Sequence, residues 1–353
     1  MSLKTGKYPL NKLTLLVVLM LGAYASIVAA LPSHLDPSKN ISGCSACHSG
    51  HGKRGTQMLK VDKKDFCFSC HGSSARTGGG NARTDMLSVF NKRSKHPVLE
   101  TSDYHSAKEE LPERNSAMPR HVACEDCHKT HEGEPGNTLK GAKGHNKGIW
   151  DKDEASAEYE VCYRCHSDSA NLRSDSKNKA DEFDLNNASF HPIEGAGKNV
   201  RVPSLQSPYD VGSIINCSDC HGNNDVFGPK GPHGSDYDFM LVKEYMTTES
   251  SESQNAYDLC YSCHNRQSIL RNESFQKHNE HIVYYHAPCI ACHVSHGSRT
   301  NKHLLDLSRF AAPTSLPSYV ASNTGRPNCY LTCHIGNKYV VHDSAFYSAK
   351  KWP

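Results

Sequence analysis

The sequence has little of what an ordinary globular core is built from. Ala, Val, Ile, Leu, Met, Phe, Trp, Cys and Gly together make up about 40% of the 353 residues, against a usual 45–50%. There are only two Trp, and the mean hydropathy is −0.64. So polar a chain buries too little apolar surface to offset the entropy lost on folding. It therefore needs disulfides, metals or large cofactors.

An excess of charge of one sign is also missing. The chain has 40 basic and 37 acidic residues, and the first 30 residues contain three of the lysines and no acid. Without residues 1–30 the two signs are therefore equal in number. This balance gives no electrostatic reason to expect a nucleic acid as partner.

After the N-terminus the sequence has no apolar run long enough for a membrane-spanning helix. Residues 1–30 resemble a secretory signal peptide: three lysines, an apolar stretch at 13–21, and small residues at 28–30 before the cleavage point, with 23–25 as the alternative. An uncleaved anchor is the competing interpretation, but the apolar stretch is far shorter than the roughly 20 residues that span a bilayer. We expect a periplasmic or secreted protein without a stable membrane anchor after cleavage.

No cysteine stands alone. The 16 cysteines form eight close pairs, and a histidine follows each pair at once, so none is left for a separate disulfide framework. Seven pairs have the form C-x-x-C-H: Cys44/Cys47/His48, Cys67/Cys70/His71, Cys124/Cys127/His128, Cys162/Cys165/His166, Cys217/Cys220/His221, Cys260/Cys263/His264 and Cys289/Cys292/His293. The eighth, Cys329/Cys333/His334, has one additional residue between its cysteines.

This spacing suits the covalent attachment of haem. Two thiols separated by two residues reach the two vinyl groups of one porphyrin, and the adjacent histidine becomes the proximal iron ligand. Zinc sites and redox dithiols also use C-x-x-C, but neither predicts a histidine directly after every pair. We expect eight c-type haems, whose propionates make the holoprotein acidic. The eighth depends on an attachment machinery that accepts the longer loop.

The motifs alternate in character. In the second, fourth, sixth and eighth, an aromatic residue follows the first cysteine, and in the others it does not. This alternation predicts an internal repeat of four two-haem units, at 31–110, 111–190, 191–276 and 277–353. With about 40 residues per haem, we expect loops and short helices wrapped around a row of haems, with little β-structure. Helical turns are predicted at 170–173 and 267–271.

Fifteen histidines outside the motifs can supply the distal ligands. His51, His131 and His296 each lie three residues beyond a proximal histidine, on the same side of the chain. Such a histidine cannot reach the opposite face of its own haem, so we expect it to bind the next one. Five others complete the predicted distal set: His96, His191, His233, His281 and His342. Two are reserves, His121 and His286, and five are assigned to the surface: His34, His105, His145, His278 and His303.

The residues at this point resemble a known family. The pattern C-x-x-C-H-x-x-H, an apolar stretch and a second C-x-x-C-H, at 44–71 and 124–166, is similar to that of doubled-CxxCH multihaem c-type cytochromes. Residues 191–296 resemble it further, with His-Pro at 191–192 and Gly-Pro-His-Gly at 231–234. The resemblance implies electron transfer. Its members include periplasmic shuttles and secreted proteins of metal-respiring bacteria, some of which form filaments.

Three functions fit the sequence. The first is an electron carrier with mainly bis-histidine haems, which is not an enzyme because both faces of each iron are closed. Its partners would be redox proteins or extracellular acceptors. The second is a nitrite or hydroxylamine reductase with one open iron, and the third is a subunit that self-associates into a filament.

Overall fold

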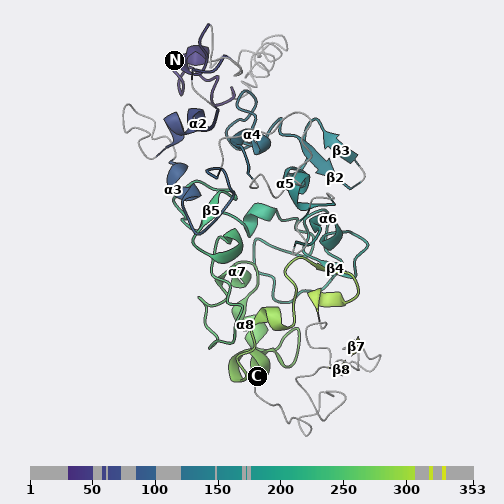
Figure 1. Cartoon of the computed structure of the whole chain (residues 1–353). Coiled ribbons are helices and arrows are strands. Elements are labelled where there is room, and N and C mark those ends of the chain that lie inside the picture. Colours follow the sequence, from purple (N-terminus) through teal and green to yellow (C-terminus); the bar gives the residue numbers. More distant parts are fainter. Residues whose placement is uncertain are drawn as a thin grey trace, which may run out of the picture.

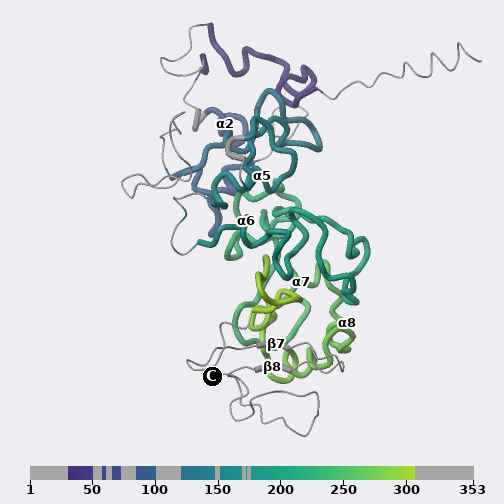
Figure 2. The backbone as a smooth tube through the Cα atoms, turned by 90° about the vertical axis from the view of Figure 1, so that its right-hand side faces the viewer, coloured from purple at the N-terminus to yellow at the C-terminus, as the bar shows by residue number. Residues whose placement is uncertain are grey.

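The computed structural model describes residues 31–50, 58–60, 63–72, 85–100, 121–147, 149–168, 172, 176–306, 318–320 and 328–330. Consecutive parts of this chain follow one another along a long axis, from the purple segment at the top of Figure 1 to the green and yellow segments at the bottom. The view turned by 90° shows the same order (Figure 2). The described residues are mostly loops, with few helices and little sheet, which confirms the coarse prediction.

Most of the helices last one or two turns. They are α2 (Lys63–His71), α3 (Leu87–Phe90), α4 (Cys124–Cys127), α5 (Glu158–His166), α6 (Lys179–Glu182), α7 (Asp258–Tyr261) and α8 (Arg266–Leu270). Shorter or wider turns are η1 (Gly43–Ala46), η2 (Cys217–Asp219), η3 (Asp238–Met240), η4 (Glu280–Tyr284), η5 (Cys289–Ala291) and η6 (Lys302–Leu304). The turn predicted at 267–271 is α8, whose first amides are capped by the Asn265 side chain. The turn predicted at 170–173 lies almost wholly outside the described residues.

The alternation among the motifs has a structural cause. The second and fourth motifs lie wholly on the nine-residue helices α2 and α5, and the sixth begins on the four-residue helix α7, whereas the first, third, fifth and seventh begin on the single turns η1, α4, η2 and η5. On a helix the two cysteines, three residues apart, share one face, and the residue after the first cysteine points elsewhere. There it enters the protein interior: Tyr163 and Tyr261 are 1% and 4% exposed.

Two small apolar clusters surround these tyrosines. Tyr163 packs with Ala180, Phe183 and Ile193, and Tyr261 packs with Ala256, Tyr257 and Ile282. Each hydroxyl donates a hydrogen bond to a carboxylate, Glu194 at 2.6 Å or Glu252 at 3.0 Å. The division into four two-haem units stays a prediction, but these clusters lie across two of its proposed boundaries.

The strands are short: β1 (Ser94–Lys95), β2 (Gly144–Asn146), β3 (Ile149–Lys152), β4 (Ser189–Phe190), β5 (Gly234–Ser235), β6 (Gly297–Ser298), β7 (Ser318–Val320) and β8 (Asn328–Tyr330). All pairs are antiparallel, in the combinations β1–β5, β2–β3, β4–β6 and β7–β8. Buried Glu160 on α5 holds the β2–β3 hairpin through Lys152, at 2.7 Å, and Asn146, at 3.2 Å.

The pairs β1–β5 and β4–β6 join segments more than a hundred residues apart, and they are alike in sequence. β1 and β4 both run directly into a His-Pro dipeptide, while β5 and β6 both begin directly after a histidine. Each pair therefore brings two histidines together. The amide of His96 donates to the carbonyl of His233 at 3.3 Å, and that of His191 donates to His296 at 2.8 Å.

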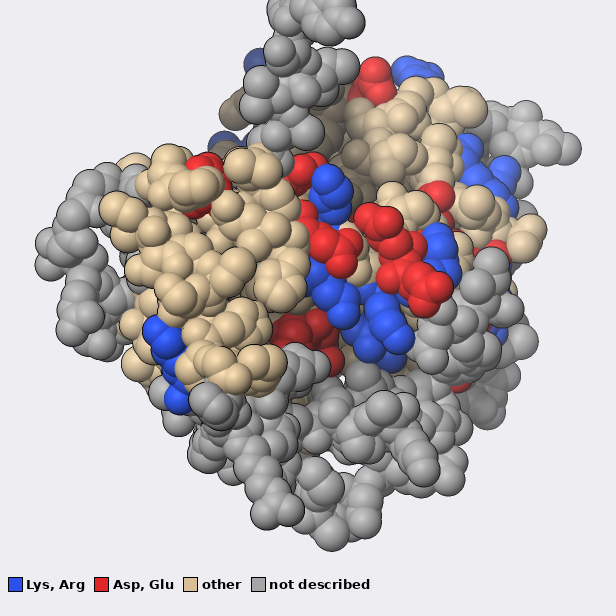
Figure 3. All heavy atoms as spheres, turned by 90° about the horizontal axis from the view of Figure 1, so that it is seen from above, with Lys and Arg blue, Asp and Glu red and all other residues tan. Residues whose placement is uncertain are grey.

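Charged side chains of both signs lie next to one another on the face shown in Figure 3, where red and blue groups meet near the middle of the view. This arrangement agrees with the near balance of charge in the sequence. In the part of the chain that the structure describes, no helix is both long and apolar enough to cross a membrane.

The β4–β6 pairing depends on a close backbone approach at Gly297. A Cβ atom there would lie 1.8 Å from the carbonyl oxygen of Glu182. We expect Gly297→Ala to lower the free energy of unfolding by about 1–3 kcal/mol, because the backbones must separate. Gly197→Ala is the matched control, since its nearest atom would be 3.9 Å away. Equal unfolding midpoints in denaturant for the two variants would contradict the prediction.

Candidate functional site

The cysteines of consecutive motifs lie beside one another. The thiols in this chain stand for the thioether sulfurs that haem attachment would create. The first cysteines of consecutive motifs are in hydrogen-bonding contact at three places. These contacts are Cys67–Cys124 between the second and third motifs, Cys162–Cys217 between the fourth and fifth, and Cys260–Cys289 between the sixth and seventh. Glu158 supports the middle contact, because its carboxylate accepts hydrogen bonds from the amide and hydroxyl of Ser218 at 2.8 and 2.6 Å.

Between the other consecutive motifs, the second cysteines influence one another electrostatically. Burial raises the pKa of Cys47, and it raises the pKa values of Cys127 and Cys220 to about 12. In each case a neighbouring sulfur adds to the rise. The neighbouring sulfurs belong to Cys70, Cys165 and Cys263 respectively. First-cysteine contacts and second-cysteine electrostatic influences thus alternate from the first motif to the seventh. The motifs therefore follow one another in space in the order of the sequence.

Cys292 is the second cysteine of the seventh motif. By the same alternation its neighbour would be Cys333 of the eighth motif, which lies outside the described residues. Cys292 directly follows η5, its amide donates to the carbonyl of Cys289 at 3.2 Å, and its carbonyl accepts from the amide of Asp306 at 2.9 Å. Its side chain is half-buried.

Each of six proximal histidines faces a second histidine ring. The ring centres are 6.0–6.3 Å apart in the pairs His48–His131, His71–His34, His128–His233, His166–His96, His221–His296 and His293–His278. The sixth motif contains the remaining proximal histidine, His264. Burial is the main cause that lowers the pKa of His264 to about 4, and His191 is the first neighbouring group that adds to this shift.

This spacing suits a shared metal. A metal–imidazole bond of about 2.0 Å on each side of one ion puts the two ring centres roughly 6 Å apart. Rings stacked directly on one another would be closer, and unrelated rings would show no common distance. The recurrence of one spacing in six pairs therefore fits two axial imidazoles on either side of an iron.

The outer ring nitrogens are held as they are in metal-binding histidines. Nδ1 contacts a backbone carbonyl at 2.5–3.2 Å in His34, His96, His128, His191, His221, His281 and His293. A carbonyl only accepts, so Nδ1 carries the proton and the lone pair of Nε2 is available to a metal. His264 uses the hydroxyl of Ser204, and His296 uses the carboxylate of Glu182.

Burial also keeps these imidazoles neutral. Burial is the main reason why the pKa values of five rings are lowered, those of His96, His191, His221, His281 and His293. It lowers the pKa to about 4 in three further rings, those of His233, His264 and His278. Neutral imidazole is the form that binds metals. The carboxyl of Glu182 has a pKa of about 2: burial opposes the charge, but the contacts with His296 and Lys179 outweigh it.

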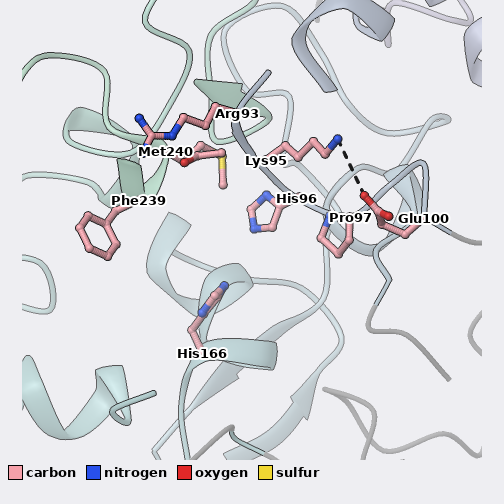
Figure 4. Close-up of a pocket in the computed structure, with 9 residues that line it drawn as sticks. Arg93, Lys95, His96, Pro97, Glu100, His166, Phe239 and Met240 are labelled. Atoms are coloured by element: carbon pink, nitrogen blue, oxygen red, sulfur yellow. Dashed lines mark ion pairs between the residues drawn. The ribbon is translucent and has the colours of Figure 1, made fainter. Parts of the chain in front are cut away.

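One of these histidine pairs lines a cavity of about 530 Å³, a size typical of ligand sites. Figure 4 shows His96 and His166 on two sides of it, with Arg93 and Lys95 beside them. Lys95 forms an ion pair with Glu100 at 3.8 Å (Figure 4), and Arg93 forms one with Asp238 at 2.8 Å. Phe239, 72% exposed in the chain itself, supplies an apolar wall.

The predicted distal set is largely brought to the proximal histidines. His96, His131, His233 and His296 face a proximal ring, and His191 lies near His264. However, His131 and His296 do not face the next motif. They face the motif two places earlier, because the chain between them folds back. His51, His342, Cys333 and His334 lie outside the described residues, and Cys329 lies in β8.

Three assignments differ in the structure. His278 rather than His281 faces His293, while the His281 ring stacks on Phe275. His34 is exposed, as expected of a surface histidine, yet its ring faces His71. His145 was also assigned to the surface, but it is 2% exposed, with Nε2 2.7 Å from Asp168.

The other histidines have plainer environments. Of the two reserves, His121 is buried and His286 is exposed. His303 is exposed, and His105 lies outside the described residues. The two missed histidines, His34 and His278, precede a first cysteine by ten and eleven residues. That shared spacing is a weak signal that could have found them.

Comparison with known families supports this site. The family model for the doubled CXXCH motif matches residues 37–76 and 207–269, which contain the first and second motifs and the fifth and sixth. The doubled motif indicates a multihaem c-type cytochrome. No curated protein and no solved structure matches it. The C-x-x-C-H motifs of the cytochrome indicate covalent haem c attachment, and the facing imidazoles fit that cofactor.

The matched ranges leave four motifs outside them. These are the third, the fourth, the seventh with Cys289 and Cys292, and the longer eighth. The third, fourth and seventh have the same C-x-x-C-H form as the matched motifs. Haem attachment at these four motifs, and with it the total of eight haems, is therefore part of the proposal below.

The assignment of His278 can be tested spectroscopically. We expect His278→Ala to convert one haem of the cytochrome from low spin to high spin, because the iron bound by His293 loses its distal imidazole. Electron paramagnetic resonance of the oxidised protein would measure this change. Gln267→Ala, at an exposed position of α8, is the control. An entirely low-spin spectrum for His278→Ala would contradict the assignment.

Proposed function

We propose that this cytochrome carries electrons through eight covalently attached, mainly bis-histidine haems arranged in the order of their motifs. The observation that carries the proposal is the combination of regularly spaced imidazole pairs with cysteines of consecutive described motifs that contact or electrostatically influence one another. When bound, each haem would supply one reversible iron oxidation and reduction. The cysteines would fix its edge, and the paired histidines would fix its plane.

The imidazole pairs favour a carrier over a reductase. A reductase needs an iron with one open face, so that substrate can reach it. Each of the seven proximal histidines in the described ranges has a second histidine opposite or near it. Two axial imidazoles would close both faces of those irons to substrate. The eighth motif, for which His281 or His342 would be the distal ligand, extends the same proposal.

The backbone of the cytochrome would hold the haems in fixed positions. Each of two strand pairs would hold the distal imidazoles of two consecutive haems. The β1–β5 pair holds His233 for the third haem and His96 for the fourth. The β4–β6 pair holds His296 for the fifth haem and His191 for the sixth. Rigid, closely spaced cofactors need little reorganisation when an electron passes. Such a row suits conduction rather than binding of a substrate.

The N-terminal segment supports a location outside the cytoplasm, since it resembles a signal peptide and haem c attachment takes place there. We place the mature cytochrome in the periplasm or outside the cell, in anaerobic or extracellular respiration. Its partners would be redox proteins or extracellular acceptors. Self-association into a filament is compatible with this role and stays a prediction.

The reduced cytochrome with and without carbon monoxide provides the test. We expect an unchanged low-spin visible spectrum, because carbon monoxide needs an open iron coordination site. His233→Ala, which opens one such site opposite His128, is the positive control and should bind about one carbon monoxide per molecule. Stoichiometric binding by the unmodified protein would overturn the carrier proposal in favour of a reductase.

A further inference from the structure

His296 is a distal histidine whose ring is held by a carboxylate. In the described ranges, seven imidazoles direct Nδ1 at a backbone carbonyl and His264 directs it at a hydroxyl, whereas Nδ1 of His296 lies 2.8 Å from Oε2 of Glu182. The Glu182 and His296 side chains are 18% and 28% exposed. The hydrogen bond is therefore partly shielded from water, where charged hydrogen bonds are stronger.

Glu182 is itself held in place from several directions. Its backbone carbonyl accepts a hydrogen bond from Asn187 at 2.9 Å, and it packs against Gly297, the residue after His296. Its Oε2 also accepts from Lys179 at 2.6 Å, and Lys177 lies 4.0 Å from Oε1. The carboxylate is thus fixed against the ring, and its charge is partly offset by Lys179.

A carboxylate on Nδ1 changes the electronic character of the ring. It draws the Nδ1 proton toward itself, so Nε2 becomes a stronger electron donor to a bound metal. A stronger axial donor stabilises ferric iron over ferrous iron and lowers the reduction potential. A neutral carbonyl acceptor has the same effect to a smaller degree.

We propose that Glu182 is a positioning residue that lowers the reduction potential of the haem held between His221 and His296, relative to haems whose imidazoles donate to carbonyls. This inference rests on the proposed bis-histidine electron carrier. The haem in question is the fifth of the row, so the cytochrome contains an internal low-potential site. The third and fourth haems on one side and the sixth and seventh on the other flank it.

Two substitutions with opposite expected effects test this inference. Glu182→Gln keeps the shape and an acceptor oxygen but removes the charge, so one transition in a spectropotentiometric titration should shift to a higher potential. Lys179→Ala removes the offsetting cation, so the same transition should shift to a lower potential. A merely structural defect would give no such pair of opposite shifts.

Asp181→Asn is the matched control. It removes a carboxylate from the adjacent position of α6, where the side chain pairs with Arg299 at 2.9 Å and not with an axial histidine. Its titration should match that of the unmodified protein. A shift as large as that of Glu182→Gln would show a general effect of charge and overturn the proposal.

The remaining outcomes are equally clear. Unchanged potentials in Glu182→Gln, or shifts of the same sign in both variants, would overturn the proposal. So would a high-spin haem in Glu182→Gln, because Glu182 would then be needed for ligation itself. Failure of the carrier function is seen separately, as carbon monoxide binding by the unmodified cytochrome.

Discussion

The separation of about 6 Å between facing imidazoles is the constraint on which the rest of the molecule depends. A histidine pair keeps this distance only if both backbones are fixed, and in every pair except His278–His293 the two rings come from distant parts of the sequence. The chain fixes these backbones with very short structural elements. Two-residue strands, single helical turns and carbonyl contacts to Nδ1 each fix one or two rings, and little further regular structure is present in the described residues.

The use of such short elements explains how much of the fold and of the candidate site could be predicted from the sequence. The attachment motifs are local, so the prediction of cysteines and proximal histidines needed only their spacing, whereas the four two-haem units drawn from the alternating aromatic residues stay a prediction. The burial of Tyr163 and Tyr261 became visible only in the fold. Sparse secondary structure also followed from composition, because so few apolar residues cannot support long helices or wide sheets.

The distal histidines could not be predicted as readily from the sequence, because which histidine is distal depends on how the chain folds back on itself. His131 and His296 share an offset from a proximal histidine, yet each faces a motif two places back. His278 and His281 are three residues apart and both contact Phe275, yet it is the His278 ring that faces His293. His34 reaches His71 because Thr130, nearly a hundred residues later, holds its Nδ1. Such choices are made by tertiary contacts.

The neighbouring sulfurs of consecutive motifs have a consequence for biosynthesis. Cys162 and Cys217, or Cys260 and Cys289, lie close enough that an oxidant could join them while they are still thiols. A disulfide between motifs would remove one attachment point from each of two sites. The two apolar clusters are also too small to hold the chain compact unaided. We therefore expect maturation to have a fixed order, in which each motif receives its cofactor while the chain is still extended, and compaction follows.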